Sequence, residues 1–332
     1  MNYQKLKELS EVNTKQFIGE ASTSSLDFTL PDFRFSDVLY RLYTRPLVSS
    51  FGSILPITKP AGLTFGLTRE YDITPPVNVE LKKDFANVAE TADLNQVKFK
   101  LKSKPVSLKT KKLKSNWSVE ALQDYRSLFT NKSQEELNEI ISNELTNEMV
   151  LELDNEAFDF MKSIAKKVNV TLTTNIGTLY SYELIGIIAR QALEIEKFTH
   201  SRHKIVVFCS NKVASLLMSH PSFVYPNKNM NLTQSIYYQG DIGNIEIYTD
   251  IYNFNNSQDD FVLVGVKDPS EGINSSIIYM PYNISMWVEP SNYESSELRF
   301  YSAFRYGLSQ VAFDEDGQDK SKMLSFVTIK IQ

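Results

Sequence analysis

The feature that most constrains the fold is a long run, from residue 133 to residue 168, that contains neither glycine nor proline. The apolar residues that recur there at every fourth position are Leu137, Ile141, Leu145, Met149, Leu153, Ala157 and Met161. This spacing places them on one stripe of an α-helix. At about 1.5 Å per residue, the run predicts a single rod roughly 50 Å long.

The start of this helix is indicated by Ser133 and Glu136, which fit the S-x-x-E capping box. A strict four-residue recurrence drifts around the helix, so the stripe is slanted. It suits packing against several elements in turn more than a two-stranded coiled coil. An ordinary core helix is the plain alternative. Ser118 is a candidate N-cap for a shorter helix that precedes the long one.

Composition narrows the class of protein. A length of 332 residues suggests about two domains, each able to bury a core. The 40 acidic and 35 basic residues give a net charge of −5, so no overall attraction to nucleic acid is expected. The single cysteine, Cys209, fits a reducing cytoplasm. No apolar run approaches the roughly 20 residues of a membrane-spanning helix, so we expect no membrane association.

The first third of the chain is expected to extend away from a core. Residues 1–53 are predicted to form an arm. Apolar and polar residues show little regular alternation there, so the region could not bury a core by itself. Residues 54–117 predict an extended β-rich excursion, in which residues 97–102 alternate with period two. One face of that strand would carry Lys98, Lys100 and Lys102.

The remaining two thirds predict a compact body. Residues 118–177 would hold the long helix and a return strand near residues 168–172. Residues 178–290 alternate helical and strand patterns, with a helix over 182–198 and a hairpin turn at 240–243. Residues 291–332 would supply two final strands, which we expect to return beneath the long helix.

A search for catalytic motifs is negative. The chain has no phosphate-binding loop and no dinucleotide fingerprint. His200 and His203 have the spacing of metal ligands, but no third ligand is evident, so no metal site is expected. Cys209 lies at the end of a predicted buried strand and is expected to be inert. We therefore expect no enzyme activity, no cofactor and no catalytic residue.

A lysine-dense tract between residues 98 and 114 contains no acidic residue. Three interpretations compete: a solvated strand face, a charge-complementary contact between subunits, and direct binding to nucleic acid. Little aromatic interleaving and the absence of arginine weaken the last one. The acidic run 314–316 offers an opposite charge. The candidate interface residues are Lys98, Lys100, Lys102, Lys111, Lys112, Lys114, Asp314, Glu315 and Asp316.

Several segments together resemble the major capsid proteins of T-even-type (myovirus) bacteriophages. The matching segments, in order along the chain, are 113–124, 136–153, 204–217, 243–252, 260–267, 278–282 and 305–309. The similarity covers roughly residues 109–313. It implies an α+β fold of the Hong Kong 97 type, shared by tailed phages and herpesviruses. The T-even insertion domain is not expected, because residues 54–117 are too few to hold it.

The resemblance also assigns roles to the five regions. Residues 1–53 would be the N-terminal arm, 54–117 the E-loop, 118–177 the P-domain with its spine helix, 178–290 the A-domain, and 291–332 strands returning to the P-domain. Copies would self-assemble into hexamers and pentamers of an icosahedral head around double-stranded DNA. Scaffold, portal and decoration proteins are possible partners. The chain would be made in the bacterial host cytoplasm and end in the virion.

Other functions stay open at this point. A pentameric vertex protein of the same family would show nearly the same pattern, and an encapsulin-like compartment shares the fold. In a different class, an intracellular enzyme with a mixed sheet would require a pocket of titratable groups. A DNA-binding module would require binding that depends steeply on salt.

Overall fold

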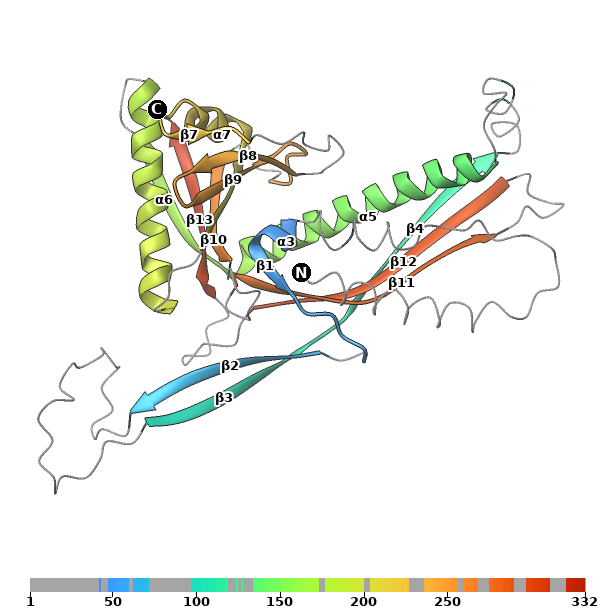
Figure 1. Ribbon diagram of the computed structural model, residues 1–332, viewed down its shortest axis with the longest axis horizontal. Coiled ribbons are helices and arrows are strands. Elements are labelled where there is room, and N and C mark those ends of the chain that lie inside the picture. Colours follow the sequence, from blue (N-terminus) through green and yellow to red (C-terminus); the bar gives the residue numbers. More distant parts are fainter. Residues whose placement is uncertain are drawn as a thin grey trace, which may run out of the picture.

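A computed structural model gives the architecture (Figure 1). The residues that it describes are Leu42, 47–59, 62–71, 97–118, Asp124, Ser127, 134–172, 177–199, 204–226, 236–255, 259–267, 275–289, 297–310 and 321–331. The arm, the S-x-x-E box at Ser133 and most of the short helix after Ser118 lie outside these ranges.

The long helix is α5, Gln134–Ile164. Its predicted apolar stripe is buried from Leu145 to Met161, at 7% exposure or less. The helix ends four residues earlier than the sequence suggested, because the chain changes directly into the strand β5, Ala165–Leu172. In β5, Val168, Val170 and Leu172 pack into the core while Lys167, Asn169 and Thr171 are exposed, a period of two that no longer fits a helix.

The strands form two main sheets, and both of them pack against α5. The smaller one has the order β1-β11-β12-β4. Its strands are β1, Gly52–Ile54; β4, Lys109–Ser118; β11, Ile277–Glu289; and β12, Glu297–Ser309. β4 lies within the range that we assigned to the excursion, yet it pairs with β12 along its whole length. Phe300, Phe304 and Tyr306 of β12 are buried on the side that faces α5.

The larger sheet has seven strands in the order β5-β13-β10-β6-β9-β8-β7. Beyond β5, the strands are β6, Lys204–Ser210; β7, Phe223–Val224; β8, Ile236–Ile242; β9, Ile245–Asp250; β10, Asp260–Lys267; and β13, Ser321–Ile331. We expected both final strands to return beneath the long helix. β13 does pack against α5, since its Phe326 ring centroid lies 6.3 Å from that of Phe158, but it pairs between β5 and β10 in the larger sheet and not beside β12.

Helices cover the larger sheet on both faces. On one face lie α6, Gly177–Thr199, which begins five residues before the predicted helix, and α7, Asn211–Met218. On the other face, Phe158 of α5 packs with its ring centroid 5.3 Å from that of Phe261 and 5.7 Å from that of Phe208. The C-terminal half of α5 therefore belongs to the core of the seven-stranded sheet, and its middle to that of the four-stranded sheet.

The hairpin between β8 and β9 turns at Gly243, where φ is +63°. Gly240, which we placed in this turn, instead lies at an irregularity within β8, with φ at +152°. A β-carbon there would approach the Val224 carbonyl oxygen to 2.3 Å. Glycine is thus required by the close approach of β7, and not by the turn itself.

A short helix, α3, Leu47–Phe51, ties the two sheets together. The buried Asp154 of α5 accepts a hydrogen bond from the Leu47 backbone N–H at 2.6 Å. The Phe51 ring lies against Gly265 of β10, where a β-carbon would come within 2.6 Å of the ring. The absence of a side chain at Gly265 therefore lets α3 reach the larger sheet.

A ribbon projects from this body (Figure 1). It consists of β2, Gly62–Tyr71, and β3, Val97–Val106, which pair antiparallel over ten residues each. At its base, Val106 is buried with Met280 and Ile57. The ribbon is thus anchored at one end, while its strands pair only with each other in the described part of the chain.

We predict that Gly265→Ala destabilises the fold by about 1–3 kcal/mol, because the new methyl group must displace the Phe51 ring. Chemical denaturation of the purified subunit, followed by circular dichroism, measures this loss. Gly186→Ala is the matched control: nothing lies within 4 Å of its β-carbon position in α6. That control is expected to stabilise by up to about 1 kcal/mol. Equal midpoints for the two variants would contradict the packing described for α3.

Candidate functional site

The lysine tract ends in β4, where alternate residues face opposite sides of the four-stranded sheet. Lys109 and Lys111 lie on the side of α5, as does Leu113, which packs against the core. The opposite side carries Lys112 and Lys114, both exposed. The tract therefore serves two surfaces, a distinction that its sequence does not reveal.

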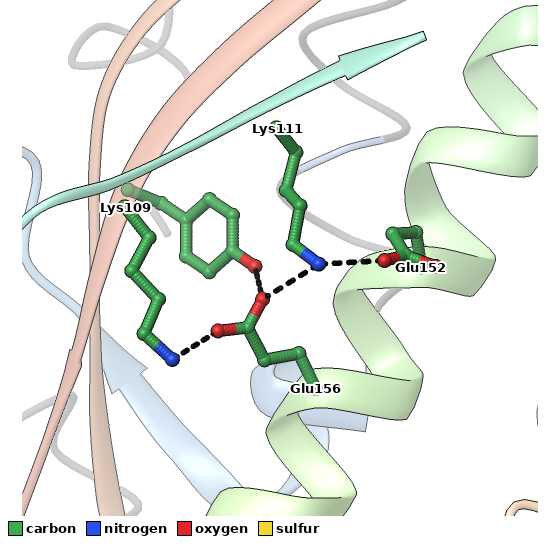
Figure 2. A network of polar contacts seen from close by, with 5 residues as sticks. Lys109, Lys111, Glu152 and Glu156 are labelled. Carbon is green, nitrogen blue, oxygen red and sulfur yellow. Dashed lines mark hydrogen bonds and ion pairs between the residues drawn. The ribbon is translucent and has the colours of Figure 1, made fainter.

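The lysines on the helix side form a polar cluster with α5 (Figure 2). The Lys111 ammonium lies 2.6 Å from Glu152 Oε1 and 3.4 Å from Glu156 Oε2. Glu156 also accepts hydrogen bonds from the Lys109 ammonium and from the Tyr306 hydroxyl. One carboxylate thus joins β4, α5 and β12.

Local geometry explains how these residues meet. Glu152 and Glu156 are four positions apart and so lie on one face of α5. Tyr306 is directly opposite Lys109 in the pairing of β12 with β4. The Glu156 side chain is only 15% exposed, whereas that of Lys109 is 61% exposed. The carboxylate is therefore partly desolvated and depends on its donors.

The protonation equilibria reflect this environment. Burial by itself raises the pKa of Glu156, but hydrogen bonds from Lys109 and Tyr306 outweigh it, so the net pKa is lowered. The hydrogen bond to Glu152 raises the pKa of Lys111. Burial, followed by the hydrogen bond to Glu156, raises the pKa of the Tyr306 hydroxyl. All of these groups keep their ordinary charge state at neutral pH, as a structural cluster requires.

The other candidate residues are placed less completely. Lys98, Lys100 and Lys102 lie in β3 of the ribbon. The acidic residues Asp314, Glu315 and Asp316 lie outside the described residues. Whether the tract meets the acidic run stays a prediction. The sequence analysis did not identify Glu152, Glu156 and Tyr306 as partners of the lysines. An acidic helix face can be recognised in the sequence, but the sequence does not show which strand lies against that face.

The signs of chemistry are few in the described structure. Cys209 is fully buried, and burial raises the pKa of its thiol, which agrees with the expected inert cysteine. His200 and His203 lie outside the described residues. Within the described ranges, no group of three or more His, Cys, Asp or Glu side chains could hold a metal ion. No helix of that part is long and apolar enough to cross a membrane.

We predict that Glu156→Gln lowers the free energy of unfolding by about 1–2 kcal/mol, because it leaves two lysines without their shared carboxylate. Denaturant unfolding at neutral pH measures the loss. Glu194→Gln is the control: its pair with Lys166, at 2.6 Å, is largely exposed, so a change below about 0.5 kcal/mol is expected. Equal effects of the two substitutions would contradict the role given to the cluster.

The difference in stability between the wild type and Glu156→Gln is also predicted to depend on pH. The pKa of Glu156 is lowered in the folded state from its ordinary value of 4.5. Its stabilisation is therefore fully present above that value and is lost as pH falls through the lowered pKa. Thermal unfolding should show a difference between wild type and Glu156→Gln that is constant from about pH 7 to pH 5. A difference that persisted unchanged to about pH 2 would contradict this assignment.

Comparison with known proteins identifies the fold and the family. A solved structure from Gordonia phage Cozz superimposes with a TM-score of 0.51, at 9% identity and over 87% of each chain. The expected α+β fold of the Hong Kong 97 type is confirmed by this likeness together with the spine-like α5 and the projecting ribbon.

The sequence relatives are themselves capsid proteins. The major capsid protein of Vibrio phage KVP40 is 25% identical over 250 residues, which cover 67% of this chain and 46% of that protein. That of Enterobacteria phage T6 is 25% identical over 230 residues, covering 61% and 44%. This chain thus spans less than half the length of these relatives. A family model described as major capsid protein Gp23 matches residues 78–329, well over half of the chain. The chain belongs to the Gp23 major capsid protein family.

Proposed function

We propose that this chain is the major capsid subunit of a tailed bacteriophage. Copies of it would assemble into hexamers and pentamers of an icosahedral head that encloses double-stranded DNA. Family membership over residues 78–329 is the observation that carries this proposal. The mature location is then the virion, and the function is structural. Scaffold, portal and decoration proteins would be further partners of the assembled head.

The ribbon supports self-assembly on physical grounds. A two-stranded ribbon is only marginally stable by itself in water. In the described chain, β2 and β3 leave their outer edges unpaired, and such edges attract other chains unless they are covered. A ribbon that stands away from its own body is therefore best explained by a neighbouring subunit that covers it (Figure 1).

The strand register shows which face of the ribbon suits that contact. Val97, Phe99 and Leu101 pair with Tyr71, Arg69 and Leu67. Directly paired residues lie on the same face, so apolar positions from both strands fall together. The lysine positions fall on the opposite face, where they pair with Glu70, Thr68 and Gly66. We therefore propose that the apolar face of the ribbon packs against the neighbouring subunit. The face that carries Lys98, Lys100 and Lys102 would lie at the rim of that contact.

Each region has a role in this proposal. Residues 1–53 act as the arm, 54–117 as the E-loop, 118–177 as the P-domain, 178–290 as the A-domain and 291–332 as its returning strands. Because β4 pairs with β12, we assign residues 109–118 to the P-domain sheet in this proposal. Contacts between unlike surfaces close into rings. Arm, ribbon and body contacts act together, so ring closure adds avidity to contacts that are individually modest.

Removing the ribbon tests the proposal. Leu63 and Pro105 are paired near its base, so replacing residues 64–104 with Asn-Gly closes a short hairpin there. We expect a folded subunit that unfolds cooperatively but forms no capsomers, because the core residues remain and the contact with the neighbour is gone. Negative-stain imaging and analytical ultracentrifugation beside the wild type measure assembly. Full-sized shells from the deletion would refute the role of the ribbon.

The wild-type result tests the function itself. The full-length chain, purified and concentrated, is expected to form rings or closed shells. Persistently single molecules, under conditions in which circular dichroism shows a folded chain, would refute the capsid function.

A further inference from the structure

The face of the four-stranded sheet that points away from α5 carries a basic patch. We define this outer face by Lys112 and Lys114 of β4, Tyr301 and Arg305 of β12, and Tyr282 of β11. The register places Lys114 opposite Tyr301 and Lys112 opposite Ala303, two residues before Arg305. The buried neighbours Phe300, Phe304 and Tyr306 alternate with these positions and face the core. The outer face is thus separate from the polar cluster on α5.

The cations of the outer face differ from those of the polar cluster in one respect. Lys109 and Lys111 are neutralised by glutamates of α5. Lys112, Lys114 and Arg305 are exposed, and none of them forms an ion pair in the described part of the chain. Three positive charges therefore stand together on a sheet surface without a counterpart among the residues that the structure describes.

Aromatic rings hold two of these cations in place. The Lys114 ammonium lies 5.8 Å from the centroid of the Tyr301 ring, and the Arg305 guanidinium lies 5.5 Å from that of Tyr282. Cation–π contacts of this kind are worth about 0.5–1 kcal/mol at exposed sites and reduce the freedom of the side chains. The cations cover ring faces on which a nucleic-acid base would have to stack. The arrangement therefore fits carboxylates better than bases.

We propose that the outer face binds the acidic segment of a second copy of this chain. This inference rests on the proposed function and names one contact within it. The segment is residues 314–319, which carry Asp314, Glu315, Asp316 and Asp319. Its four carboxylates are opposite in sign to the three cations and enough to pair with each of them. Charge-assisted hydrogen bonds of lysine and arginine to carboxylates are among the stronger polar contacts.

Chain length favours a second copy over the same copy. The segment connects Ser309 of β12 with Ser321 of β13. Both anchors lie at one end of the sheet, since Ile278 pairs with Ser309 and the adjacent Ser276 hydroxyl donates to the Met323 carbonyl at 3.0 Å.

From Ser309 to Tyr301, which faces Lys114, the strand runs about 26 Å at about 3.3 Å per residue. A connection that must return to Ser321 extends at most about 20 Å outward. In its own subunit the segment would reach Arg305 readily but Lys112, about 20 Å away opposite Ala303, only when fully extended. Its backbone would stop about 6 Å short of Lys114. A second copy has no such limit.

Charge reversal tests the contact. Lys112→Glu with Lys114→Glu should reduce the yield of closed shells at least about tenfold, because the contact recurs in every ring. Asp314→Lys with Asp316→Lys should do the same, and the four changes together should restore assembly. Lys167→Glu with Lys330→Glu alters the net charge equally at exposed positions of the larger sheet and should assemble normally. Circular dichroism confirms that each variant is folded. Unaffected assembly of the first two variants would overturn the inference.

A cross-link tests whether the contact joins two copies. Lys114→Cys chains and Asp316→Cys chains are mixed, assembled and treated with oxidised glutathione. We expect covalent dimers from the mixture and far fewer from either variant alone, since Cys209 is buried. A chain that carries both cysteines and closes only an internal disulfide would overturn the inference.

A final measurement addresses the competing ligand. Fluorescence anisotropy with a labelled DNA duplex at about 150 mM salt is expected to show no binding that depends on Lys112 and Lys114. Loss of such binding in the Lys112→Glu, Lys114→Glu variant would assign the outer face to nucleic acid instead. If the wild type fails to assemble, the proposed function itself fails. If the wild type and all variants assemble equally, only this contact is refuted.

Discussion

The structure depends on one helix that must bury its apolar stripe against two sheets at once. The C-terminal half of α5 places Phe158 among the rings of the seven-stranded sheet, and its middle covers the four-stranded sheet. Neither sheet shares a strand with the other in the described chain. The relative position of the two sheets therefore rests on packing: on α5, on α3 through Asp154 and Gly265, and on Ser276 just before β11, which exchanges hydrogen bonds with Val266 of β10.

The polar cluster adds specificity to this packing. Apolar burial is not directional, so a slanted stripe could slide along a sheet at little cost. Glu156 joins Lys109 of β4 and Tyr306 of β12, and so it favours one position of the helix over the strands (Figure 2). The lysines of the same sheet then fall into two groups. Those that face α5 form ion pairs within the subunit, and those of the outer face are exposed and can bind a partner.

Much of the fold follows from local pattern. The long helix, the buried strand β6 and the burial of Cys209 were all evident from periodicity and residue type. The places where prediction failed have physical causes. The end of α5 at Ile164 was missed because no glycine or proline marks it, and only the pairing of β5 with β13 makes a strand preferable there. Gly240 was assigned to a turn because its close approach to β7 is invisible in the chain.

By itself, the sequence determined the secondary structure of the body and, through short motifs in order, the family. Those properties depend on neighbours within a few residues, or on similarity to other chains. The tertiary structure alone decided which lysines face glutamates, which strands share a sheet, and which face of the ribbon is apolar on both strands. These outcomes depend on register and on contacts between residues far apart in sequence, such as Glu156 and Tyr306. A one-residue shift in register would reverse which lysines face α5 and which ribbon positions share a face.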